Sequence, residues 1–100
     1  MIEIEHDLLV EAALKRNPKI EELVFDADFH LRAINPCAAK TNPEWCFNLT
    51  DICLAKYNQA LTETDDFIIK EYCRGQIEIT SQIRNFISVK IPLTKYPVEG

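Results

Sequence analysis

Residues 23–40 read LVFDADFHLRAINPCAAK, and the expected architecture is built outward from them. Leu23–Asp26 is a short apolar run that ends in a carboxylate. Asp26-Ala27-Asp28 is typical of a turn, because Asp side chains hydrogen-bond the local backbone. The alternation over His30–Ile34 favours a second strand, so the two segments predict a hairpin. That strand ends at Asn35-Pro36, where a favoured N-cap precedes proline and predicts a short helix over Pro36–Lys40.

This order of elements resembles the start of a PAS (Per-Arnt-Sim) sensor domain, in which two strands lead into an Asn-Pro-Ala-Ala segment. The matching residues are Phe25–Asp28, Leu31–Ile34 and Asn35–Ala38, and Phe86–Leu93 is similar to the family's late strand ending in Lys-x-Pro-Leu. The resemblance implies an α+β fold. We expect a PAS-like antiparallel sheet with short helices and one longer helix on one face, preceded by an N-terminal helix.

The resemblance also implies that a strand is missing. In the family a final strand lies in the middle of the sheet, and nothing follows Gly100 in this sequence. We therefore expect a core truncated at its C-terminus. Buried backbone groups rarely stay unpaired, so the gap should be closed by Met1–Glu5, by a partner chain, or by direct pairing of the flanking strands.

The N-terminal segment predicts a helix over Glu5–Arg16 with an apolar stripe on one side. Asn17-Pro18 ends it, because the residue before proline avoids the helical region. This division gives an N-terminal helix in residues 1–18 and the sensor core in residues 19–100. The stripe is either a dimerisation surface or a cover for the sheet. The candidate dimerisation residues are Leu8, Leu9, Ala12 and Ala13.

The rest of the chain predicts short helices, then one long helix, then a hairpin. Short helical pieces are expected at Glu44–Phe47, after Asn42-Pro43, and through Leu54–Tyr57. The long helix follows a near capping box at Thr62–Asp65 and stops at Gly75, which suits the C′ position. Alternation then predicts strands over Gln76–Ile83 and Phe86–Ile91. The last residues, Lys95–Gly100, are expected to turn into one more strand.

Composition narrows the class of protein. The chain has 100 residues, a net charge of −5 and a pI near 4.9, which argues against a nucleic-acid surface. No apolar run approaches the roughly 20 residues that span a bilayer, and early acidic residues oppose a secretory signal. A cytoplasmic location is the resulting expectation. The four cysteines match no common zinc spacing and are expected to be buried free thiols.

Patterns for catalysis and cofactors are weak, so we expect no enzyme and no cofactor. The segments nearest to the flavin-binding motif of the PAS photosensors lack its arginine and glutamine. The expected long helix has no histidine of the kind that binds haem in that family. What remains is an apolar cavity with a few polar groups, although the same side chains would equally fill a core without a cavity. The candidate ligand-binding residues are Trp45, Tyr57, Ile69, Tyr72, Arg32 and Ser88.

The resemblance implies a sensory, ligand-binding or protein-interaction module of a signal transduction or transcription regulatory protein. Such a module would form a homodimer and pass a signal to an output domain outside this chain. A possible small molecule would shift the packing of helices on the sheet. The alternative is a small stand-alone α+β enzyme or ligand carrier with a cavity.

Overall fold

The computed structural model describes the backbone of residues 2–89 and the side chains of residues 8–89, and all of its regular elements are helices. They are α1 (Ile2–Lys15), α2 (Pro18–Ala33), α3 (Pro36–Thr41), α4 (Pro43–Glu63) and α5 (Phe67–Ser88). The expected α+β fold is therefore wrong, and so is the resemblance to a PAS domain. The described residues contain no strand, so they form no sheet and leave no vacant strand position to be filled.

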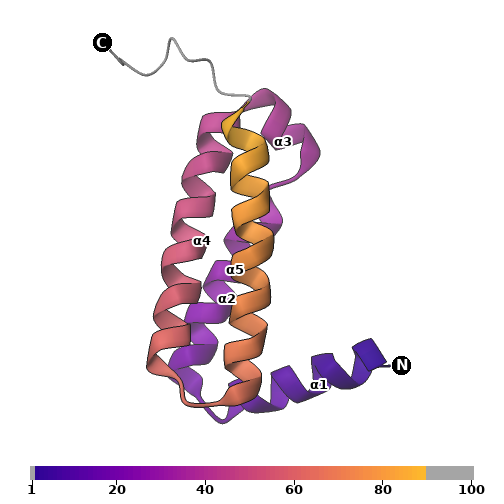
Figure 1. Cartoon of the computed structure of the whole chain (residues 1–100), viewed down its shortest axis with the longest axis vertical. Coiled ribbons are helices and arrows are strands. Elements are labelled where there is room, and N and C mark those ends of the chain that lie inside the picture. The colour runs from indigo at the N-terminus through magenta and orange to yellow at the C-terminus, as the bar shows by residue number, and fades with distance from the viewer. Residues whose placement is uncertain (1, 90–100) are drawn as a thin grey trace.

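Helices α2, α4 and α5 run side by side as an elongated bundle, with α4 packed along both of the others (Figure 1). The short α3 lies at one end of the bundle. At the other end α1 leaves sideways from the start of α2. The Cα atoms extend over 48 × 28 × 17 Å, and the three long helices lie along the longest of these dimensions.

The predicted first hairpin lies inside α2 except for its last residue, Ile34. The residues that this helix buries are Ile20, Val24 and Ala27, a spacing of four and three that places them on one side of a helix. The predicted turn at Asp26-Ala27-Asp28 is a helical turn whose two carboxylates point to different neighbours. The prediction failed because a five-residue alternation is too short to separate a strand from a helix whose apolar residues recur every three or four positions.

The predicted second hairpin lies mostly inside α5. Its buried residues are Ile69, Cys73, Thr80 and Ile87. They are four, seven and seven residues apart, which is about one or two helical turns each time, so they lie on one side of the helix. Gly75 lies within the helix instead of ending it, and a Cβ at that position would meet nothing within 4 Å. The expected strand Phe86–Ile91 is helical as far as Ser88, and its last two residues lie outside the described range, as does Lys95–Gly100.

Three helix starts follow local chemistry, and the Asn-Pro pairs at 35–36 and 42–43 located two of them correctly. The Asn35 side chain accepts a hydrogen bond from the Ala38 backbone N–H at 2.8 Å, and Pro36 begins α3. Asn42 accepts in the same way from the Trp45 N–H at 3.4 Å. Asp66 caps α5 through the N–H groups of Ile68 and Ile69, close to the start expected at Thr62–Asp65. The short helices expected after Asn42 are one continuous α4.

Helix α1 was predicted at nearly its observed position, whereas the expectation that Met1–Glu5 supplies a strand is wrong for its described residues. Ile2–Glu5 is helical, and Met1 lies outside the described residues. Val10, Ala13 and Leu14 are buried and join the main apolar cluster of α2, α4 and α5. The second half of α1 therefore packs on the bundle, while Leu8 and Leu9 stay exposed.

Candidate functional site

Helix α2 presents two chemically different surfaces, and both bear on function. Its inward side buries an apolar stripe and turns Asp28 toward α4 and α5. Its outward side carries Phe25 and Phe29, which are 53% and 71% exposed although both are large apolar side chains. Residues four apart lie on one face of a helix, so the two rings are neighbours along the surface.

The inward site is a polar cluster around the half-buried Asp28. One carboxylate oxygen accepts a hydrogen bond from the hydroxyl of Tyr57, and the other accepts from the hydroxyl of Tyr72 at 2.7 Å. The Nε2 group of Gln76 donates to the Tyr57 oxygen at 3.1 Å and lies 3.4 Å from Asp28 Oδ1. These groups come from three helices, so the cluster ties α2 to α4 and α5.

The surroundings of this cluster keep both phenols neutral. Burial, followed by the hydrogen bond to Asp28, raises the pKa of Tyr57 and of Tyr72 far above the ordinary value. Burial, with the Asp28 charge nearby, likewise raises the pKa of the Cys53 and Cys73 thiols to about 11. Groups that resist ionisation make poor nucleophiles and poor general bases at neutral pH. At neutral pH the two phenols therefore act as hydrogen-bond donors to Asp28.

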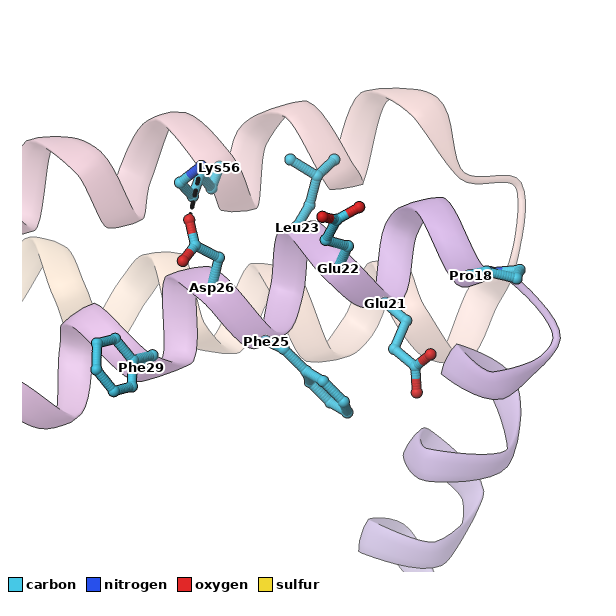
Figure 2. Close-up of a pocket in the computed structure, with 8 residues that line it drawn as sticks. All are labelled: Pro18, Glu21, Glu22, Leu23, Phe25, Asp26, Phe29 and Lys56. Atoms are coloured by element: carbon cyan, nitrogen blue, oxygen red, sulfur yellow. Dashed lines mark ion pairs between the residues drawn. The ribbon is translucent and has the colours of Figure 1, made fainter.

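The outward site is a shallow pocket of about 790 Å³ along α2 between Pro18 and Phe29 (Figure 2). Asp26 points to α4, where it pairs with Lys56 at 2.8 Å, and the hydrogen bond from Lys56 lowers the pKa of Asp26. Figure 2 shows Phe25 and Glu21 pointing away from α4, toward the side on which α1 leaves. The lining residues are Pro18, Glu21, Glu22, Leu23, Phe25, Asp26, Phe29 and Lys56.

Charge is distributed unevenly along this outward surface. Glu21 and Glu22 lie near the N-terminal end of α2, and the exposed Arg32 lies near its C-terminal end. A smaller depression formed by Phe25, Asp28, Phe29 and Arg32 continues the pocket in that direction. Within residues 8–89, neither Glu21 nor Arg32 forms an ion pair.

A second hollow lies at the α3 end of the bundle and has a volume of about 490 Å³. Its lining is almost entirely apolar. The lining residues are Ile34, Asn35, Pro36, Ala39, Gln82, Ile83, Phe86 and Ile87. Its lining residues include no charged side chain, and Asn35 and Gln82 supply the polar side chains among them.

The predicted ligand-binding residues are brought together only in part. Tyr57, Ile69 and Tyr72 belong to one packed cluster, where the first two are completely buried. Arg32 is close enough to influence the pKa of Tyr72. Trp45 and Ser88 are exposed at the other end of the bundle. A ligand role for these residues stays a prediction, as does dimerisation through Leu8, Leu9, Ala12 and Ala13, although Ala13 is already covered by this chain's own core.

The side chains of residues 8–89 include no cluster of three His, Cys, Asp or Glu that would hold a metal ion. The prediction of buried thiols is right for Cys46, Cys53 and Cys73 and wrong for Cys37, which is exposed on α3. No helix in the described part of the chain is long and apolar enough to cross a bilayer.

Sequence reasoning missed both surfaces of α2. Phe25 was assigned to a strand, and the two carboxylates at 26 and 28 were assigned to a turn. The signal for the outward surface was present in the spacing: Phe25 and Phe29 are four apart and out of phase with Ile20, Val24 and Ala27. The partners of Asp28 lie 29, 44 and 48 residues away, so no local pattern marks them.

Comparisons of the chain with protein-family models, with curated proteins and with solved structures return no match.

Proposed function

We propose that this chain is a protein-interaction module whose docking surface is the outward face of α2. The observation that carries the proposal is the pair Phe25 and Phe29, both more than half exposed and one helical turn apart. Aromatic side chains are enriched at protein interfaces, where they supply much of the binding energy. Exposed apolar groups gathered on one surface mark interaction sites more often than the same groups scattered singly.

The construction of α2 supports this function. The helix is held rigidly from behind by its buried stripe, by the Asp28 cluster and by the pair between Asp26 and Lys56. A surface on a fixed element loses little conformational entropy when it binds, so more of the contact energy appears as affinity. Covering each ring would contribute on the order of 1–2 kcal/mol from apolar burial alone.

The charged rim supports it as well. Glu21 and Arg32 border the two rings and have no ion-pair partner among the described residues. Charges around an apolar centre set the orientation and the choice of partner in protein complexes. A cytoplasmic setting belongs to the proposal, and identification of the partner would test it.

Photo-crosslinking tests the proposal directly. Phe29 is replaced by benzoylphenylalanine in cells that express the chain. The matched control carries the same group at Phe67, which is 70% exposed and lies at the start of α5. We expect a discrete protein adduct from position 29 that disappears when Phe25→Ser is added, and no such adduct from position 67. Equal labelling from both positions, or none from position 29, would contradict the proposal.

A further inference from the structure

The outward face of α2 has a pattern that matches itself when the helix is reversed. Glu21 and Arg32 lie at opposite ends, and Phe25 and Phe29 lie between them. Phe25 follows Glu21 by four residues, and Arg32 follows Phe29 by three. At a rise of about 1.5 Å per residue, a reversed copy laid on this face brings each ring opposite the other ring and each charge opposite its counter-charge, within about one residue of register.

From this pattern we propose that the protein docked on α2 is a second copy of the same chain, with the two α2 helices antiparallel about a twofold axis. The inference rests on the proposed docking role of α2. Phe25 of one copy packs against Phe29 of the other, and Glu21 faces Arg32. Each contact occurs twice, as a twofold interface requires.

Charge selects this arrangement over the other simple one. A parallel pair of α2 helices places Glu21 against Glu21 and Arg32 against Arg32, and like charges in contact are unfavourable. The antiparallel pair makes both contacts attractive. It also supplies a partner for two charges that form no ion pair within the described residues.

The contact area is small, so the expected affinity of the dimer is low. The face between Pro18 and Arg32 is roughly 20 Å long at the helical rise, and its apolar part consists of two rings on each copy. Such a patch is smaller than the roughly 800 Å² that each partner buries in a standard stable complex. We expect a reversible dimer that forms at high micromolar concentration.

Sedimentation equilibrium between about 10 µM and 1 mM measures this association. We expect the mass to rise with concentration from 11.5 kDa toward twice that value. Because a twofold interface loses two rings for each substitution, Phe29→Ser should weaken the dimer on the order of 100-fold. The control Phe67→Ser removes an equally exposed ring at the start of α5 and should leave the association unchanged.

Charge reversal tests the geometry independently of apolar burial. Glu21→Arg alone and Arg32→Glu alone each create two like-charge contacts and should weaken the dimer by about tenfold. The double variant restores opposite charges in the antiparallel arrangement and should recover the wild-type dissociation constant. In a parallel pair the double variant would again place like charges together. Recovery in the double variant also shows that the singles did not simply unfold.

The outcomes separate this inference from the proposed function. A mass of 11.5 kDa at every concentration overturns self-association. A position-29 adduct with a different protein overturns it too, while leaving the docking role of α2 in place. Dimers that are insensitive to both Phe29→Ser and charge reversal overturn the α2 interface.

Discussion

Two carboxylates in this bundle are held in contrasting ways, one near its centre and one near its α3 end. Asp28 is half-buried and accepts from two neutral phenols of α4 and α5. Asp51 is exposed on α4 and pairs with Arg84 of α5, whose guanidinium carbon lies 4.0 Å from the centre of the Phe47 ring. Both clusters join α4 to α5, and the central one also joins α2 to both. They differ further in burial and in the charge of the donors.

The difference shows where hydrogen bonds matter for stability. An exposed ion pair can be replaced by contacts with water on both sides, so its net contribution is small. The phenols of Tyr57 and Tyr72 are surrounded by apolar side chains and have no such replacement, so loss of their acceptor costs their desolvation. The central cluster should therefore contribute more to stability, although the end cluster is the one that contains an ion pair.

The largest expected effect tests this directly. Asp28→Ala removes the acceptor of both phenols and should lower the free energy of unfolding by about 3 kcal/mol, measured by urea denaturation. Asp28→Asn keeps one acceptor oxygen in the same place and should lose roughly half as much. A loss for Asp28→Ala no larger than that for Asp51→Ala would break the comparison.

Tyr72→Phe should cost about 1 kcal/mol at pH 7, because it removes one donor to Asp28. The same variant also tests, at alkaline pH, how much the Tyr72 hydroxyl contributes to the stability of the central cluster. The pKa of Tyr72 is raised in the fold above the roughly 10 of a free phenol, so its stabilising effect is complete below pH 10 and is lost as pH rises toward the folded value.

Urea midpoints at pH 7 and pH 10.5 check that sign. Wild-type stability should fall between the two, and it should fall less in Tyr72→Phe. The thiols of Cys53 and Cys73, whose pKa is raised to about 11, also make stability fall as pH rises, in wild type and variant alike. Equal slopes in wild type and variant would show that Tyr72 is not part of the effect.

Gly75→Ala is expected to stabilise the fold by about 0.5–1 kcal/mol, because alanine is the better helix former and a Cβ there meets nothing within 4 Å. Gly75 lies between Tyr72 and Gln76 on α5, so the substitution changes the backbone of the central cluster without changing its hydrogen bonds. A rise in the midpoint of thermal unfolding supports a helix through this residue. A fall would instead support a helix that ends there.

The smallest expected effect is that of Asp51→Ala. The side chains of Asp51 and Arg84 are 54% and 31% exposed, so the pair should contribute no more than about 0.5 kcal/mol. The midpoint in urea should move little, and added salt should reduce the difference from wild type. A loss above about 2 kcal/mol would show that the end cluster stabilises the fold about as much as the central one does.

The sequence by itself determined the features that depend on neighbours within four residues. The starts of α3 and α4 could be predicted because an Asn side chain and the N–H it caps are three residues apart. The end of α1 at Asn17-Pro18 is equally local. These signals act the same way in any fold, so they remained correct although the expected fold class was wrong.

Only the tertiary structure decided that residues 23–33 and 76–88 are helical. A short amphipathic segment can fit the period of a strand as well as that of a helix, and the surface that packs against it decides which of the two forms. Here α4 covers α2 and α5 through side chains distant in sequence, such as Tyr57, whose hydroxyl reaches Asp28 across 29 residues. The exposed pair Phe25 and Phe29 arises from the same cause, because packing against α4 chose which side of α2 faces inward and left those rings outside.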